Sequence, residues 1–266
     1  MKFEGNLKKM KVLMEGDEIQ YTMDLNGDAI YMNDLIGSRI EINFEGRINC
    51  IACGTETKKS FGGGFCFSCF TTAPEASPCI IHPELCEAHL GGGRDPEWEE
   101  IHHNRPHFVY LAVSSAIKVG ITREDQIPTR WIDQGANYAI KIAEVPYRQL
   151  AGQIEVALKD VYTDKTNWRK MLTNEYLEGV DLVEEKWALE DVLPSDLIEY
   201  FTEDDEVTYL HYPVIEYPDK AKTVNLDKSP NIIDQIQGIK GQYILFKNIG
   251  ALNIRKHSGY FIQLTT

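Results

Sequence analysis

The chain of 266 residues contains only six cysteines and lacks any long run of apolar residues. No stretch reaches the roughly 18 apolar residues that a bilayer-spanning helix needs. The opening Met1-Lys-Phe-Glu-Gly5 has no apolar core of the kind found in secretory signals. These absences predict a cytoplasmic protein that has no membrane partner and keeps its thiols reduced. The length allows a sizeable core and predicts one to three domains.

Four of the cysteines have the spacing of a zinc site. Cys50, Cys53, Cys66 and Cys69 read C-x2-C, twelve residues, C-x2-C. Two such pairs form turns whose thiolates can converge on one tetrahedral ion. Gly54 can supply the left-handed conformation that such a turn often needs. Because four thiolates leave no open coordination position, the spacing predicts a structural Zn²⁺ rather than a catalytic one.

A second group of metal-ligand residues follows within eleven positions, at Cys79, His82, Cys86 and His89. Its spacing is not that of a standard zinc finger, and Pro83 interrupts it. We expect a second zinc ion with both cysteines as ligands and His82 and His89 as the candidates to complete the set. Three more histidines lie close behind, at His102, His103 and His107. The alternative is two buried cysteines without metal and solvated histidines.

Negative charge is concentrated in one part of the chain. The net charge is −14, and residues 171–210 carry thirteen acidic residues against Lys186 alone, a net charge of −12. We call residues 171–210 the acidic block. The rest of the chain is close to neutral, so it can still present a local basic face. The simplest interpretation of the acidic block is a solvated helical face with a loop, and the alternative is a segment that binds a protein partner or mimics nucleic acid.

The pattern along the chain favours an α+β fold made of five segments. Strands are expected at 18–23 and 39–44, a hairpin turn at Asn26-Gly-Asp28, and an amphipathic helix over 147–161. Whether the two β-rich ends pair with each other is left open by the sequence. The segments are a β-rich N-terminal segment (1–49), a zinc-ribbon module (50–106), an α/β core (107–175), acidic helices (176–206) and a β-rich C-terminal segment (207–266).

A β-hairpin is predicted around Ser114-Ser-Ala116, between the apolar strands 108–113 and 117–121. Because strand side chains alternate, a three-residue loop keeps the faces in phase and pairs Tyr110 with Gly120. One face is then wholly apolar. The other carries a tyrosine, a lysine and a threonine around an open floor at the glycine, where a ligand could approach. The alternative is an ordinary half-exposed hairpin.

The hairpin and the helices after it resemble the core of the GIY-YIG nucleases over residues 107–168. The resemblance rests on Val109-Tyr-Leu111, Lys118-Val-Gly-Ile-Thr122, Arg130 and Glu155. It implies that Tyr110 is the general base or orients the nucleophile, that Arg130 stabilises phosphate charge, and that Glu155 ligates Mg²⁺ or Mn²⁺. Lys118 stands in place of the superfamily's second tyrosine, as in a phage-type branch that reads K-I-G. A lysine can hold a phosphate but cannot serve as a phenol.

The sequence therefore predicts a zinc-containing protein that associates with nucleic acid, either DNA or RNA, and cleaves it with a divalent metal. Two alternatives remain open. In the first, the zinc module and Lys118 bind phosphates and nothing is cleaved. In the second, the acidic block binds a basic protein and the chain is an adaptor. An enzyme requires Tyr110, Arg130 and Glu155 to converge around an open cleft.

A wider resemblance covers most of the chain. The four-cysteine module and six further motifs are similar to a bacterial family catalogued as a domain of unknown function, which brings no activity with it. The motifs are Pro83-Glu-Leu-Cys86, Pro96-Glu-Trp98, Val109-Tyr-Leu-Ala112, Lys118-Val-Gly-Ile-Thr122, Pro128-Thr-Arg-Trp-Ile-Asp-Gln-Gly-Ala136 and Asp164-Lys-Thr-Asn-Trp168.

Overall fold

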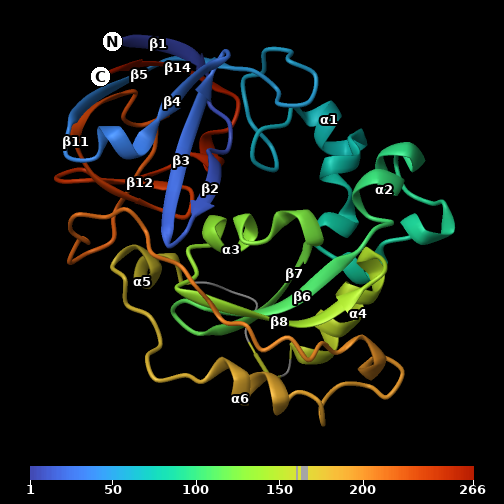
Figure 1. Cartoon of the computed structure of the whole chain (residues 1–266). Coiled ribbons are helices and arrows are strands. Elements are labelled where there is room, and N and C mark those ends of the chain that lie inside the picture. Colours follow the sequence, from blue (N-terminus) through green and yellow to red (C-terminus); the bar gives the residue numbers. More distant parts are fainter. Residues whose placement is uncertain (160, 163–166) are drawn as a thin grey trace. The chain divides into compact units, whose positions relative to one another are not determined.

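A computed structural model describes residues 1–159, 161–162 and 167–266, so part of the 164–168 motif lies outside the described residues. The fold is mixed α+β, with several sheets and short helices (Figure 1). The chain divides into two compact units. Unit 1 comprises Met1–Thr71, Leu172–Asn174 and Leu210–Thr266, and unit 2 comprises Thr72–Met171 and Glu175–Tyr209. None of the described helices is long and apolar enough to cross a membrane.

Unit 1 is built around a seven-stranded sheet in the order β1-β14-β5-β11-β12-β13-β10. Its β5 lies between β14 and β11, and β1 pairs with β14 from Lys2 opposite Thr265 to Asn6 opposite Phe261. The two β-rich ends of the chain therefore form one sheet. Its strands are β1 (Lys2–Asn6), β5 (Arg39–Ile48), β10 (Thr223–Val224), β11 (Asn231–Lys240), β12 (Tyr243–Phe246), β13 (Gly250–Asn253) and β14 (Tyr260–Thr265).

A smaller sheet completes unit 1, in the order β2-β3-β4. The predicted turn between β3 and β4 is confirmed, because Asn26 and Gly27 both have positive φ and Leu25 pairs with Asp28. The elements are β2 (Lys11–Glu15), β3 (Glu18–Leu25), β4 (Asp28–Tyr31), the 3₁₀ helices η1 (Met32–Leu35) and η8 (Arg255–His257), and α1 (Phe67–Thr72), whose last residue falls in unit 2.

Unit 2 contains a four-stranded sheet in the order β7-β6-β8-β9. The predicted hairpin register is confirmed, with Tyr110 opposite Gly120 and Ala112 opposite Lys118. The strands are β6 (His107–Val113), β7 (Ile117–Arg123), β8 (Tyr138–Val145) and β9 (Thr208–Tyr209). The helices are α2 (Pro96–His102), α3 (Thr129–Asp133), α4 (Arg148–Leu158), α5 (Trp168–Leu172), α6 (Leu182–Trp187), and the 3₁₀ helices η2 (Pro74–Ala76), η3 (Pro78–Ile80), η4 (Pro83–Leu85), η5 (Ala88–Leu90), η6 (Glu124–Gln126) and η7 (Ile198–Tyr200).

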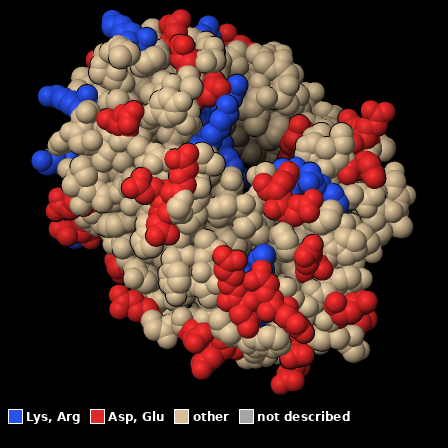
Figure 2. Space-filling model, in the orientation of Figure 1, with Lys and Arg blue, Asp and Glu red and all other residues tan. Residues whose placement is uncertain are grey.

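The acidic block covers the apolar face of this sheet together with α4. Its leucines, among them Leu182, Leu189 and Leu193, join the core formed by the apolar side chains of β6, β7 and β8. Carboxylates on the same segment face outward, and Figure 2 shows them gathered in the region where α6 lies in Figure 1. The block is less helical than predicted, since α6 spans six residues and is followed mainly by turns. Burial of its leucines, rather than long helix, holds it in place.

Lys186, the single base of the acidic block, is fully buried and fixes the fold of the segment. Its ammonium donates to the Asp204 carbonyl and to Asp205 Oδ1, each at 2.8 Å. Lys141 on β8 forms an ion pair with Asp204. Hydrogen bonds from these lysines lower the pKa of both aspartates. These two carboxylates are therefore already engaged within unit 2.

A cysteine-containing module that runs from η2 to α2 packs against α4 (Figure 1). The contact is closest at Gly152, where an added Cβ would lie 2.3 Å from the Glu84 nitrogen and 2.5 Å from the Pro83 carbonyl carbon. Arg148 at the start of α4 donates to the Cys79 carbonyl at 3.1 and 3.2 Å. The module is thus fixed to the helix by backbone contacts and by one guanidinium.

Replacing Gly152 with alanine tests this packing. Glycine-to-alanine changes inside helices usually stabilise by about 0.5–1 kcal/mol. Here the clash is with backbone, which cannot rotate away, so we expect a loss of about 1–3 kcal/mol in the free energy of unfolding. Chemical denaturation measures it, with Gln153→Ala on the exposed side of the same helix as the control. A stabilised Gly152→Ala protein would contradict this close approach.

Candidate functional site

The four-cysteine cluster of unit 1 begins two residues after the end of β5. Cys50 and Cys53 lie in a turn closed by the Gly54 amide donating to the Cys50 carbonyl at 2.8 Å. Gly54 has φ +73°, the left-handed conformation expected there. A second pair lies at the start of α1, where the Cys69 amide approaches Cys66 Sγ at 3.4 Å. The end of β5 therefore positions Cys50 and Cys53, and the start of α1 positions Cys66 and Cys69.

The four sulfurs lie within 4.8 Å of one another, and Cys53 Sγ and Cys66 Sγ are 4.0 Å apart. Zinc–sulfur bonds of about 2.3 Å in a tetrahedron place the sulfurs about 3.8 Å apart. Hydrogen bonds from Thr55 lower the pKa of Cys53 to about 6, whereas hydrogen bonds with Cys53 and Cys66 raise the pKa of Cys69 to about 12. The four sulfurs are thus close enough to share protons in the absence of a metal. The cluster can hold a metal ion such as zinc.

A second cluster in unit 2 joins Cys79 and Cys86 with Glu99 and His103, whose ligand atoms also lie within 4.8 Å of one another. The His103 Nδ1 atom is 3.8 Å from Cys79 Sγ and 3.7 Å from Cys86 Sγ. The two cysteines were selected from the sequence as ligands. Their carboxylate and imidazole neighbours were not selected, although a spacing of four residues places both on one side of α2.

His82 and His89, expected to complete this cluster, lie elsewhere. His82 Nδ1 faces a Glu84 carboxylate oxygen at 3.3 Å. His89 stacks on Tyr147 with ring centroids 4.2 Å apart. The expected histidines are replaced in the cluster by Glu99 and His103, because Pro83 starts η4 and the turn between the two cysteines directs His82 and His89 to other partners.

Tyr110 on β6 lies directly over Gly120 on the paired strand. A Cβ at Gly120 would be 2.6 Å from the Tyr110 hydroxyl and 2.7 Å from its ring carbon Cζ. The expected open floor is therefore filled by the tyrosine itself. The hydroxyl donates to Gln134 Oε1 at 2.9 Å, and the ring meets Trp131 of α3 edge-on. Tyr110 is 0% exposed, and burial raises the pKa of its phenol.

Arg130 on α3 is a charged neighbour of the other three residues. Its charge acts on Tyr110, on Lys118 and on Glu155. Lys118 is 4% exposed, and burial together with the like charge of Arg130 lowers its pKa to about 7. The structure thus brings together the four residues that the GIY-YIG resemblance selected, each from a different element. We call Tyr110, Lys118, Arg130 and Glu155 the polar cluster.

Glu155 projects from α4 into a half-buried environment, and burial raises the pKa of its carboxyl group. Lys159, Arg148 and Arg130 oppose this shift, whereas the carboxylate of Glu84 adds to it. One oxygen of Glu84 is buried without a hydrogen-bond partner. A second carboxylate therefore lies near Glu155, supplied by the module that packs on α4.

Two neighbours of the polar cluster were missed in the sequence: Glu84 and Gln134. Gln134 lies four residues after Arg130 at the end of α3, a spacing that could have revealed it. Glu84 had no such signal, because its role depends on the contact between η4 and α4. Arg148 shares the helix stripe of Glu155, as the spacing of α4 predicts.

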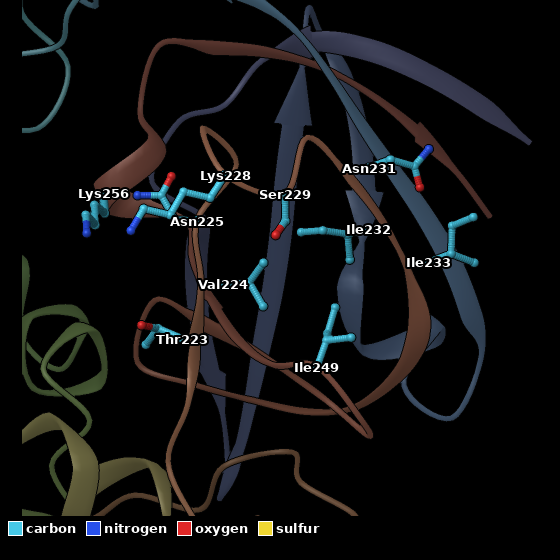
Figure 3. A pocket seen from close by; sticks show the side chains of 10 residues that line it. All are labelled: Thr223, Val224, Asn225, Lys228, Ser229, Asn231, Ile232, Ile233, Ile249 and Lys256. Atoms are coloured by element: carbon cyan, nitrogen blue, oxygen red, sulfur yellow. The ribbon is translucent and has the colours of Figure 1, made fainter.

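A separate hollow of ≈ 650 Å³ lies in unit 1 (Figure 3). Asn225, Lys228 and Lys256 lie on one side of it, and Ile232 and Ile249 project toward the other. No acidic residue, histidine or cysteine lines it. It therefore offers cationic and apolar contacts, without the ligands that a catalytic metal would need.

The metal content of the four-cysteine cluster is a first test of this site. We expect Cys53→Ser and Cys69→Ser each to lower the zinc bound per chain by one ion, because three thiolates hold the metal much more weakly than four. Elemental analysis of the purified protein measures this, with Ser68→Ala on α1 as the control. Unchanged zinc in both cysteine variants would show that the cluster holds no metal.

The buried amine of Lys118 gives a second test. Its pKa is about 7 in the folded protein and 10.5 as the ordinary value, so the unfolded chain binds more protons between these limits. Stability should therefore rise with pH from about 7 to 10.5, by at most about 1.4 kcal/mol per pH unit. Lys118→Met lacks this contribution. Its free energy of unfolding should therefore exceed that of the wild type most below pH 7, and the difference should shrink as the pH rises above 7. Denaturation at several pH values measures the difference, and exposed Lys2→Met should show none.

A family model matches most of the chain. No curated protein and no solved structure matches the chain. The matching model carries the description "Protein of unknown function (DUF2797)" and covers residues 37–262, a range that includes both cysteine clusters and the polar cluster. On this match, the chain belongs to the DUF2797 family.

Proposed function

We propose that unit 2 carries a GIY-YIG-like site that cleaves the phosphodiester bonds of nucleic acid with one divalent ion, Mg²⁺ or Mn²⁺. The observation that supports this most directly is that the Tyr110 hydroxyl donates to Gln134 at the end of α3, the helix that also carries Arg130. The charge of Arg130 affects the pKa of Tyr110, of Lys118 and of Glu155. Cleavage requires a nucleophile-orienting group, a cation beside the phosphate and a metal ligand. The polar cluster supplies one residue of each kind.

Each residue has a role that suits its surroundings. Glu155 binds the metal, and Glu84 is close enough to add a carboxylate to the same region. Arg130 offers a planar fork of donors for the phosphate oxygens and offsets the charge that develops on them. Tyr110 orients the attacking water through its hydroxyl, which Gln134 now holds at 2.9 Å. Lys118 provides a second cation in place of the superfamily's second phenol.

The burial of Tyr110 favours a second candidate function. Its ring is covered by Trp131 and rests on Gly120, so the phenol is enclosed within unit 2. A protein that binds nucleic acid without cleaving it would need only the cations of this site, because phosphate contacts supply most of the non-specific affinity. The same assay distinguishes the two functions.

We expect Glu155→Gln to reduce metal-dependent cleavage by roughly a hundredfold or more, because the amide keeps the shape but loses the charge that binds the metal. Affinity for nucleic acid should change little, since no phosphate contact is removed. Arg130→Ala should weaken both cleavage and binding. The measurement uses single- and double-stranded DNA and RNA with Mg²⁺ and with Mn²⁺.

Glu144→Ala is the matched control, because Glu144 is an exposed carboxylate on β8 of the same unit. Lys118→Tyr restores the superfamily residue and should retain or raise the activity. Cleavage that persists in Glu155→Gln would contradict the assignment of the metal ligand. Binding without cleavage in every protein, wild type included, would establish the non-catalytic function instead.

A further inference from the structure

The second cysteine cluster gathers side chains from three separate turns of the chain. Cys79 lies in η3, Cys86 follows η4, and Glu99 and His103 come from α2 and its C-terminal cap. Asp95 caps the start of this helix by accepting from the Trp98 amide at 3.1 Å, which fixes the direction of the helix. Little apolar core joins these short elements, so something else must hold the four side chains together.

The separations between His103 Nδ1 and the two cysteine sulfurs fit a tetrahedral zinc ion. Zinc–sulfur bonds of about 2.3 Å and zinc–nitrogen bonds of about 2.0–2.1 Å separate a sulfur from a nitrogen ligand by about 3.6 Å. The observed separations from His103 Nδ1 are 3.8 Å to Cys79 Sγ and 3.7 Å to Cys86 Sγ. The third neighbour of this nitrogen is Glu99 Oε2. A single ring nitrogen makes one hydrogen bond, as donor or as acceptor, yet three polar atoms surround it.

The burial of Glu99 is the second observation that points to a cation. Glu99 is 1% exposed, and its Oε1 atom has no hydrogen-bond partner. Its Oε2 contacts His103 Nδ1, and two cysteine sulfurs add further electron-rich atoms beside this buried carboxylate, so the cluster gathers more acceptor atoms than the imidazole can satisfy. A dication at the centre of the four ligand atoms would bond to every one of them.

The surroundings of the cluster complete its electrostatics. Two thiolates, one carboxylate and a neutral imidazole around Zn²⁺ leave one negative charge. The guanidinium of Arg148, which is itself mostly buried, acts on both Cys79 and Cys86. Ser77 Oγ lies 3.0 Å from Cys79 Sγ, within hydrogen-bond reach. Outer partners of this kind orient the ligands of protein metal sites.

Arg148 also links the second cysteine cluster to α4. Its guanidinium donates to the carbonyls of Cys79 and Ile80, and its own amide donates to the His103 carbonyl at 3.0 Å. Both ends of the module therefore meet the first residue of α4, the helix that carries Glu155. An ion that joins Cys79 to His103 also fixes the position of the module on this helix.

We propose that Cys79, Cys86, Glu99 and His103 bind a second zinc ion, which closes the module and fastens it to α4. Thiolate and imidazole ligands favour zinc over Mg²⁺ or Ca²⁺. Four protein ligands leave no position for water, so the ion is structural. The site is independent of the proposed cleavage and is present whether or not unit 2 acts on nucleic acid.

The experiment counts zinc in the full-length protein and in single variants. We expect two ions per chain in the wild type and one in Cys79→Ser, Cys86→Ser and Glu99→Gln. Cys86→His, which keeps a ligand of a different kind, should return the count toward two. His82→Ala and His89→Ala are the matched controls and should retain both ions, because these histidines lie outside the cluster.

A spectroscopic measurement keeps the proposal testable if a variant fails to fold. Cobalt added to the metal-free wild type should fill two classes of site, one with four sulfurs and one with two sulfurs, a nitrogen and an oxygen. The visible bands of tetrahedral Co²⁺ move to shorter wavelength as sulfur ligands are replaced. Wild-type protein that takes up a single metal ion with four-sulfur bands would overturn the second site, as would two ions that persist in Cys79→Ser and Cys86→Ser.

Discussion

The register of the β6–β7 hairpin is the constraint on which the rest of unit 2 depends. A three-residue loop places Tyr110 opposite Gly120, and this pairing turns every second side chain of both strands toward one shared core. A shift of β7 by one residue would direct Lys118 into that core and move Val119 to the opposite face, beside Tyr110. Because α4 and the acidic block pack against the apolar face, their positions also follow from this register.

The sequence predicts such local features well, because they depend on spacing within one segment. Alternation identified the hairpin and its register, paired cysteines identified the unit 1 cluster, and Asn26-Gly27 identified the β3–β4 turn. The carboxylate and histidine of the second cysteine cluster were also accessible in principle, since Glu99 and His103 are four residues apart on a helix that begins at a visible Asp-Pro cap. Proximity to Cys79 and Cys86 in the chain directed attention to the wrong histidines.

Features that depend on contacts between distant segments could not be found in this way. To predict that the Tyr110 ring covers Gly120, one needs the side-chain rotamer of Tyr110 as well as the register of the two strands. The approach of Glu84 to Gly152 joins residues 68 positions apart, and nothing in either local pattern indicates it. The acidic block shows the same limit. Its charge suggested a solvated surface, whereas its leucines and Lys186 determine its structure.

The pairing of β1 with β14 has a consequence for the order in which the chain can fold during its synthesis. Lys2 pairs with Thr265, so the edge of the large sheet cannot form until residue 265 has been made. The residues of unit 2 lie between the two halves of unit 1 and require neither end. Unit 2 can therefore fold first, and by bringing the flanking segments nearer it shortens the effective loop that the sheet of unit 1 must close.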